Sequence, residues 1–345
     1  MQRAAATADT SSLTIERCLD GRRQSLAEDV LDGLTRRFKE LPPKHFYDAG
    51  AALFERICEL PEYYPARTER ALLDEHADEL AAGTGAVEIV ELGSGSATKT
   101  RLLLGALYAS GTLDRYVSID VTEQAVRDCA IELVAEYPQL RVHGLVADLD
   151  YHLDRVPPRI GPRLVIFLGG TLGNYPAGSR RRLLRQIAAL LGPADHLLLG
   201  VGLVTEPALL EAAYDDSAGI TAQFDRNVLS VLNRELDAEF DPADFEHRAL
   251  FEARHEWIEM RLRARRNHTV HMRQLDLEVH FEAGEELRTE ISARFTPRRL
   301  ASDLAAADLA LTQWLPDAYG LFALSLARRS NPPSIRPPYA CGRLP

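Results

Sequence analysis

The stretch "VEIVELGSGSATKT", residues 87–100, passes from an apolar run into a glycine-rich loop and then into polar residues. A short apolar run followed by Gly93-Ser94-Gly95 is typical of a buried strand that turns into a helix beside a nucleotide or nucleoside. Thr98 stands where the dinucleotide fingerprint GxGxxG has its third glycine, which lets the helix pack closely behind a pyrophosphate. The loop alone is a weak signal, but it favours a cofactor without a pyrophosphate.

The segments around this loop alternate between strand and helix patterns from about Glu69 to Leu203. Such alternation predicts a doubly wound α/β domain with a parallel sheet and right-handed crossovers. The expected strands are 87–92, 116–120, 141–148, 163–169 and 196–202, and the expected helices reach Leu80, follow Lys99, and span 123–137 and 179–191.

The alternation breaks after Leu203, where helical "EPALLEAAYDD" and the antiparallel strand pattern "TVHMRQLDLEVHF" (269–281) follow. A helix over 297–309 and a hairpin of two strands then end the sheet as in Rossmann-like, seven-stranded class I methyltransferases. We therefore expect a methyltransferase domain with a second, inserted α+β domain. Because clefts between domains are preferred places for ligands, we expect the inserted domain to bind the substrate. The expected parts are a disordered leader (1–15), the substrate-binding domain (16–68 and 204–294), the methyltransferase domain (69–203 and 295–328) and a proline-rich flexible tail (329–345).

The composition favours a small-molecule substrate. The net charge of −11 disfavours nucleic acid and anionic membranes, since both need clustered Lys and Arg. Four scattered cysteines give neither zinc nor disulfide spacing, and "HTVH" (268–271) lacks further ligands, so we expect no metal. No apolar run approaches the length of a membrane span, and we expect a cytoplasmic protein and take a monomer as the default.

Polar residues at the ends of successive strands predict S-adenosylmethionine as the cofactor. Asp120 ends the second strand, where an acidic side chain accepts hydrogen bonds from ribose hydroxyls. Asp148 and Leu149 end the third strand, where a carboxylate and a backbone N–H can meet an adenine edge. Lys99 can pair with a methionine carboxylate, which NAD lacks. An NAD-type fold with a degenerate loop or a dead pocket remains the alternative.

Several stretches together resemble the ergothioneine-pathway L-histidine Nα-methyltransferases over about residues 15–328. They are "PKHFYDAGAALFERICELPEYYPARTE", "ELGSGSATKT", "FLGGTLGN", "AAYDDSAGITAQFDRNVL", "WIEMRLRAR" and "FEAGEELRTEISARF". The resemblance implies three methyl transfers that convert histidine into hercynine. By this match Gly93, Lys99, Asp120, Asp148 and Leu149 contact S-adenosylmethionine, whereas Tyr64, Asn174, Tyr214, Glu290 and Ser292 contact histidine.

The chemistry of these residue types agrees with the match. Asn174 and Tyr214 can donate to a carboxylate without a full positive charge, which would repel the cofactor's sulfonium. Glu290 and Ser292 lie two apart, so on an extended segment they point the same way and can share one imidazole. Tyr64 is a candidate to orient the amine, and no residue is assigned as a general base.

Two further functions stay open from the sequence. A paralogue could methylate another free amino acid, or a noncatalytic sensor could bind histidine and S-adenosylmethionine without reaction. The chain also departs from the family pattern in two places. A loop after Tyr47 is one residue shorter than usual, and Gly202 in "GVGLVTEP" stands where relatives commonly carry an acidic residue. Both could alter substrate affinity.

Overall fold

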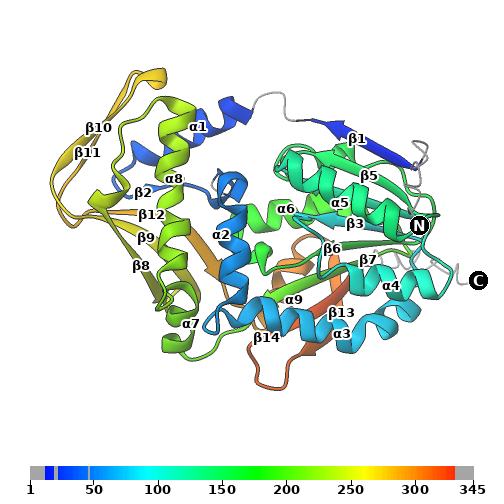
Figure 1. Ribbon diagram of the computed structural model, residues 1–345. Helices are drawn as coiled ribbons and strands as arrows, with labels where there is room; N and C mark the ends of the chain where they lie inside the picture. The colour runs from blue at the N-terminus through cyan, green and yellow to red at the C-terminus, as the bar shows by residue number, and fades with distance from the viewer. Residues whose placement is uncertain (1–11, 19–21, 46, 331–345) are drawn as a thin grey trace, which may run out of the picture.

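The computed structural model describes residues 12–18, 22–45 and 47–330, which form three sheets with helices around them (Figure 1). The larger sheet has the strand order β1-β5-β4-β3-β6-β7-β14-β13. The six strands from β1 to β7 in this order pair in parallel, and β14 pairs antiparallel with both β7 and the edge strand β13. The strands are β1 (Leu13–Arg17), β3 (Glu88–Leu92), β4 (Arg115–Asp120), β5 (Arg141–Val146), β6 (Arg163–Phe167), β7 (His196–Gly202), β13 (Leu309–Pro316) and β14 (Phe322–Arg329).

Five helices cover the two faces of this sheet. Alternate residues of β3 point to opposite faces, so Ile89 and Val90 belong to different cores. Helices α3 (Tyr64–Thr84), α4 (Arg101–Ala109) and α5 (Glu123–Glu136) pack on the Ile89 face, and α6 (Ala177–Ala189) and α9 (Pro297–Ala305) pack on the Val90 face. The predicted doubly wound α/β class is confirmed.

The strand β1 corrects the expectation of a disordered leader. Leu13–Arg17 pairs in parallel with β5, from Leu13 opposite Val142 to Arg17 opposite Val146. Gly144 of β5 leaves room for Val126 of helix α5 on this side of the sheet, because a Cβ at Gly144 would lie 2.5 Å from Val126 Cγ1. β1 therefore extends the predicted seven strands to eight, and its residues 13–15 belong to the stretch that was expected to be disordered. The rest of the leader (1–11) and most of the tail (331–345) lie outside the described residues, but Arg329 ends β14 and is not part of a tail.

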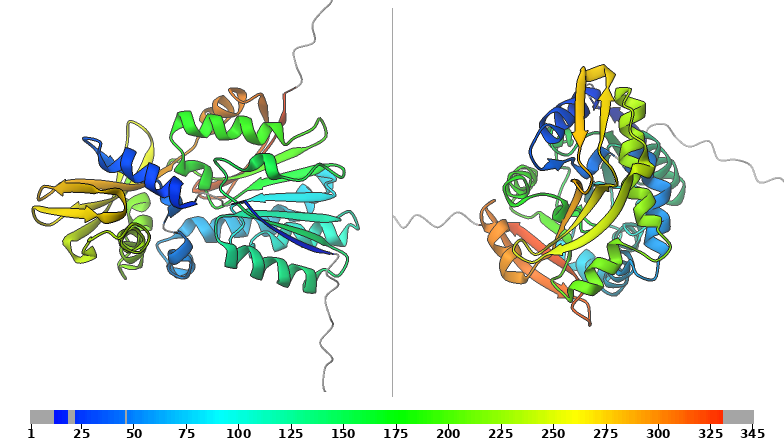
Figure 2. Two further views of the ribbon diagram at one scale, coloured as in Figure 1. Left: turned by 90° about the horizontal axis from the view of Figure 1, so that it is seen from above. Right: turned by 90° about the vertical axis from the view of Figure 1, so that its left-hand side faces the viewer.

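The smaller unit is built on a four-stranded sheet with the order β2-β12-β9-β8 (Figures 1 and 2). Its core joins helix residues such as Phe224 and Val228 to strand residues such as Met260 and Leu262. The elements are α1 (Arg22–Leu34), β2 (Lys39–Glu40), α2 (Tyr47–Glu59), α7 (Pro207–Tyr214), α8 (Ile220–Leu236), β8 (Phe245–Glu252), β9 (Trp257–Ala264), β10 (His268–Met272), β11 (Leu277–Phe281) and β12 (Glu286–Ala293).

Two parts of this unit bear on the sequence predictions. The antiparallel pattern predicted over 269–281 is present as the β10–β11 hairpin. The segment after Tyr47, expected as a loop, is instead the helix α2, and its Gly50 packs so closely on Phe224 that a Cβ would lie 2.9 Å from that ring. The two-domain division of the chain stays a prediction.

The two units meet where β12 ends beside the large sheet. Phe295 donates its backbone N–H to the carbonyl of Gly202 at 2.9 Å, and Leu203 forms a parallel bridge with Phe295. The turn after β6, the 3-10 helix η3 (Thr171–Asn174), packs against the same end of β12. No helix among the described residues is both long and apolar enough to span a bilayer.

Candidate active site

The glycine-rich loop after β3 is fixed by the end of β4. Gly93 and Gly95 adopt positive φ angles of 69° and 49°, so the loop turns sharply and its N–H groups point inward. The Gly95 N–H donates to Asp120 Oδ2 at 2.9 Å, and the Gly93 N–H donates to the carbonyl of Ile119 at 2.8 Å. Asp120 also accepts from the Thr122 N–H, so its carboxylate is held at the loop, where the prediction places ribose hydroxyls.

Lys99 has an internal partner that the prediction did not include. Its ammonium forms an ion pair with Glu69 of α3, a residue that is fully buried. The other oxygen of Glu69 accepts the Gly169 N–H at 2.7 Å, at the start of the turn after β6. Glu69 therefore ties the cofactor loop to the turn that carries Asn174. Contact of Lys99 with a cofactor carboxylate stays a prediction.

Asp148 has partners both in its own loop and in the N-terminal part of the smaller unit. Its Oδ1 accepts the Asp150 N–H at 2.9 Å, and its Oδ2 lies 3.3 Å from Lys44 Nζ. Leu149 is half-buried against the core of the large sheet. Burial alone would lower the pKa of Lys44, but Asp148, Asp29 and Asp150 outweigh it and raise that pKa to about 12.

A buried carboxyl lies directly behind the glycine loop. Glu91 of β3 accepts hydrogen bonds from the hydroxyls of Thr100 and Tyr116. Burial raises its pKa to about 7, while the two hydroxyls and Lys99 act in the opposite direction. Glu91 thus anchors the start of α4 to two strands and supports the loop.

The turn after β6 needs glycine for two different reasons. Gly169 and Gly170 have positive φ angles of 76° and 70°, which reverse the chain. Gly173 lies against β12, and a Cβ there would be 2.8 Å from the carbonyl oxygen of Ala293. This close approach brings the half-buried Asn174 next to the strand that carries the predicted substrate residues.

Tyr214 and Ser292, which are both predicted to contact the substrate, lie in contact with each other. The Tyr214 hydroxyl donates to Ser292 Oγ at 3.0 Å, joining the end of α7 to β12. His247 supports this arrangement, because its ring bonds the carbonyl of Tyr214 at 2.8 Å and the carboxylate of Asp225 at 2.7 Å. Burial lowers the pKa of His247, but the bond to Asp225 outweighs this and leaves the pKa raised. Neither His247 nor Asp225 belongs to a pattern that pointed to the site from the sequence.

Glu290 lies on the same strand, β12, and its carboxyl group is buried. Its Oε2 is buried and has no hydrogen-bond partner within the described part of the chain. Burial raises its pKa to about 8; the nearby Asp225 raises it further, whereas Arg294 and His247 act in the opposite direction. A β-bulge between Arg288 and Glu290 shifts the register of β12 just before this residue.

Arg294 adds a buried positive charge beside Tyr214, one of the two neutral donors predicted for the substrate carboxylate. Its guanidinium lies over the ring of Tyr214, with 5.2 Å from Cζ to the ring centroid. Burial raises the pKa of Tyr64, whereas the charge of Arg294 lowers it, which places Tyr64 in the same surroundings. The hydroxyl of Tyr64 is buried and bonds to no other described residue.

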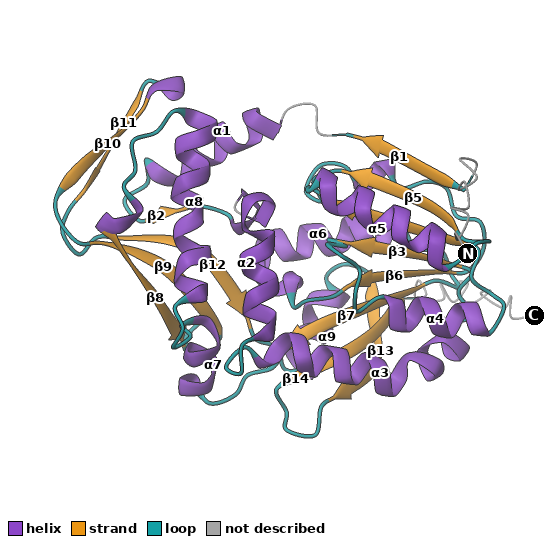
Figure 3. Cartoon of the chain, viewed as in Figure 1, coloured by secondary structure: helices purple, strands orange, loops and turns teal. Residues whose placement is uncertain are grey.

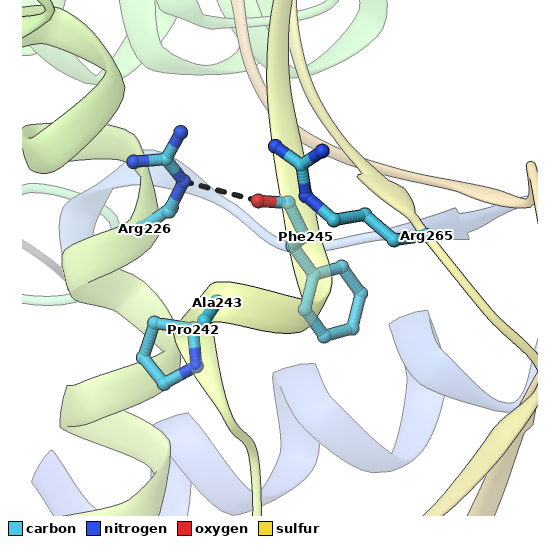
Figure 4. Close-up of a pocket in the computed structure, with 5 residues that line it drawn as sticks. All are labelled: Arg226, Pro242, Ala243, Phe245 and Arg265. Carbon is cyan, nitrogen blue, oxygen red and sulfur yellow. Dashed lines mark hydrogen bonds between the residues drawn. The ribbon is translucent and has the colours of Figure 1, made fainter.

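Figure 4 shows a hollow elsewhere in the smaller unit, lined by Arg226, Pro242, Ala243, Phe245 and Arg265. The Nε of Arg226 already has a partner within the protein, because it donates to the carbonyl of Phe245 at 3.1 Å. None of the predicted site residues lines this hollow. The cluster around Tyr214 and β12 is therefore the better candidate for substrate binding.

The family model described as "Histidine-specific methyltransferase, SAM-dependent" matches residues 26–329 of the chain. The chain belongs to this family. The histidine N-alpha-methyltransferase of Mycolicibacterium smegmatis is 46% identical over 93% of this chain and 100% of its own length. That of Mycobacterium tuberculosis is 45% identical over 90% of this chain and 97% of its own. Ergothioneine biosynthesis protein 1 of Neurospora crassa is 33% identical over 62% of this chain and 26% of its own.

Membership of the histidine-specific methyltransferase family confirms several predictions at once. The chain is an S-adenosylmethionine-dependent methyltransferase, and the resemblance read from its motifs is correct. The residues present fit the cofactor, because the Gly93–Gly95 turn, Asp120 and Asp148 lie at neighbouring strand ends of the sheet. The individual roles of the site residues stay predictions.

Proposed function

We propose that this methyltransferase transfers three methyl groups in succession to the α-amine of free L-histidine, giving hercynine, the first step of ergothioneine biosynthesis. The two mycobacterial relatives named histidine N-alpha-methyltransferases support this, since they match nearly the whole chain at 45% and 46% identity. The relative from Neurospora crassa is named for ergothioneine biosynthesis, which supports the place in the pathway.

The protein's part in catalysis is positioning. S-adenosylmethionine supplies an electrophilic methyl group on a sulfonium. The chain has to present a neutral amine in line with that methyl, which turns a chance encounter into one oriented pair. We assign this orientation to Tyr64 and Asn174, because the Tyr64 hydroxyl is buried and unpaired among the described residues and Asn174 follows the turn tied to Lys99 through Glu69.

The specificity for histidine is assigned to the β12 side of the pocket. A carboxyl oxygen of Glu290 can accept a hydrogen bond from one ring N–H, and Ser292 can bond to the other ring nitrogen. Burial of both residues makes an unpaired partner costly, so an amino acid without ring nitrogens is rejected. The single observation that carries the proposal is the buried Glu290 Oε2, which has no partner within residues 12–18, 22–45 and 47–330.

The experiment is a substrate panel. The purified protein is incubated with S-adenosylmethionine and each of the twenty free amino acids, and the masses of the products are measured by mass spectrometry. Histidine alone should gain three methyl groups. Methylation of another amino acid instead would contradict the substrate, and no product with any of them would contradict the assignment as a histidine methyltransferase.

We also propose that the enzyme works as a cytoplasmic monomer without a nucleic-acid partner. The acidic net charge of −11 supports the last point, because nucleic-acid binding relies on basic clusters. Light scattering coupled to gel filtration would test the monomer, and a mass of twice the chain would contradict it.

A further inference from the structure

The residue directly after β12, Arg294, carries a buried positive charge that has no part in the proposed recognition of the imidazole ring. Glu290, Ser292 and Arg294 follow one another at every second position, so an extended chain presents them on one face. Arg294 is only 2% exposed. Figure 3 shows β12 running from the smaller sheet toward the large one, which brings this end of the strand to the junction of the two units.

Two of the three nitrogens of the Arg294 guanidinium are unpaired among the described residues. Its Nε and Nη2 are both buried and have no hydrogen-bond partner in the part of the chain that the structure describes. These two nitrogens form one edge of the guanidinium, the edge that binds a carboxylate through two parallel hydrogen bonds. The hydroxyl of Tyr64, also buried and unpaired among the described residues, is a third donor near the same charge.

The other side of the guanidinium is enclosed by the protein. Nη1 lies toward Gly202, where a Cβ would be 2.1 Å away, and the face lies over the ring of Tyr214. Among the described residues, no carboxylate accepts from the Nε or Nη2 of Arg294. A buried, permanently charged group without an acceptor is costly, so its free edge is suited to an anionic ligand.

We propose that the Nε–Nη2 edge of Arg294 binds the α-carboxylate of the amino-acid substrate, beside the Tyr64 hydroxyl that orients the amine. This inference rests on the proposed function and adds a residue to it. Glu290 at one end of the strand face accepts from the ring, and Arg294 at the other end donates to the carboxylate. Gly202 is needed for this binding, because an acidic side chain at that position would give Arg294 a partner within the protein.

The test compares histidine with histamine, which has the ring and the amine but no carboxylate. Calorimetry with S-adenosylhomocysteine present measures binding without transfer. Arg294→Met should weaken histidine binding by about 10- to 100-fold, the loss typical of a charged hydrogen-bond partner, and leave histamine binding nearly unchanged. Arg294→Lys, which keeps the charge but loses the fork, should recover part of the affinity for histidine.

A second variant keeps the test valid if Arg294→Met does not fold. Gly202→Asp places a carboxylate against the guanidinium and should weaken histidine binding while sparing histamine. An equal loss for both ligands, or no loss for either, would overturn the inference and leave Arg294 a packing role. If the wild-type protein methylates histidine while the variants show either pattern, only this inference fails. If the wild type neither binds nor methylates histidine, the proposed function fails with it.

Discussion

The carboxyl of Glu290 lies in surroundings that oppose its ionisation. Burial raises its pKa from 4.5 to about 8 in the folded chain. Below about pH 4.5 the group is protonated in both the folded and the unfolded state, so it has no effect on stability there. As the pH rises from 4.5 to about 8, the unfolded state releases the proton first, and the folded state loses relative stability.

This dependence gives a prediction for Glu290→Gln. The variant lacks the ionisable group. Its free energy of unfolding should therefore increase relative to that of the wild type as the pH rises from 4.5 to about 8. Urea unfolding of both proteins at several pH values in the absence of ligand measures the difference. Glu246→Gln, at an exposed position of β8, is the control. A difference between Glu290→Gln and wild type that stays constant with pH would contradict the assignment.

At the scale of elements, the contact between η3 and β12 sets where Asn174 lies. Gly173→Ala should destabilise the protein by about 1 to 3 kcal/mol, because the new methyl would lie 2.8 Å from a backbone oxygen that cannot turn away. The turn would move off β12, and histidine affinity should fall with stability. Thermal unfolding and calorimetry measure the two effects.

The matched control for this variant is Gly178→Ala in α6. A Cβ at Gly178 meets nothing within 4 Å, and alanine is the better helix former, so stability should stay level or rise. Equal effects of the two substitutions would show that close packing at Gly173 does not matter.

The link between α3 and the cofactor loop gives a second prediction at this scale. Glu69→Gln removes the charge that pairs with Lys99 and should lower the free energy of unfolding by roughly 1 to 3 kcal/mol. This is less than for a fully buried pair, since the Lys99 side chain is 29% exposed. Glu75→Gln, at an exposed position of the same helix, should have little effect. Chemical unfolding compares the two, and equal stabilities would contradict a structural role of the Glu69 pair.

The strands β3 to β7 of the large sheet were predictable because each has a strong local pattern. The run 87–92 and the loop after it have strand and turn character by themselves, and β3 spans Glu88–Leu92. Strand β1 was missed because it is a five-residue edge strand whose pairing with β5 is invisible in its own sequence. Helix α8 was not predicted either, although Phe224, Val228 and Leu232 recur at helical spacing and could have revealed it.

The candidate site was predictable only in its residue types and motifs. Tyr214 and Ser292 are 78 residues apart, and only the resemblance to a family suggested that they meet. Arg294 carries no signal in the sequence, since an arginine on a strand is usually solvated. Its role depends on burial by Gly202 and Tyr214, which are brought to it by other elements.

At the scale of the whole molecule, Lys44 joins the smaller unit to the cofactor end of the large sheet. Its ammonium lies 3.3 Å from Asp29, 3.3 Å from Asp148 and 3.6 Å from Asp150. Lys44→Met would leave these carboxylates facing one another without that cation. Hydrogen exchange should then become faster both in the segment around Lys44 and in the loop around Asp148. Mass spectrometry measures the exchange.

Lys39→Met is the control for this prediction, because Lys39 pairs with Glu285 inside the smaller unit. It should leave exchange around Asp148 unchanged. If Lys44→Met also leaves that loop unchanged, Lys44 does not connect the two units energetically.

The central claim is that the protein holds the imidazole at Glu290 and Ser292 and presents the α-amine to the methyl donor. The most direct measurement is nuclear magnetic resonance of the product made from histidine and S-adenosylmethionine labelled with carbon-13 in the methyl group. We predict one product with three equivalent labelled methyl groups on the α-nitrogen and none on the ring. A labelled methyl on a ring nitrogen would contradict the orientation proposed here, and so would a product that stops at one methyl group with cofactor in excess.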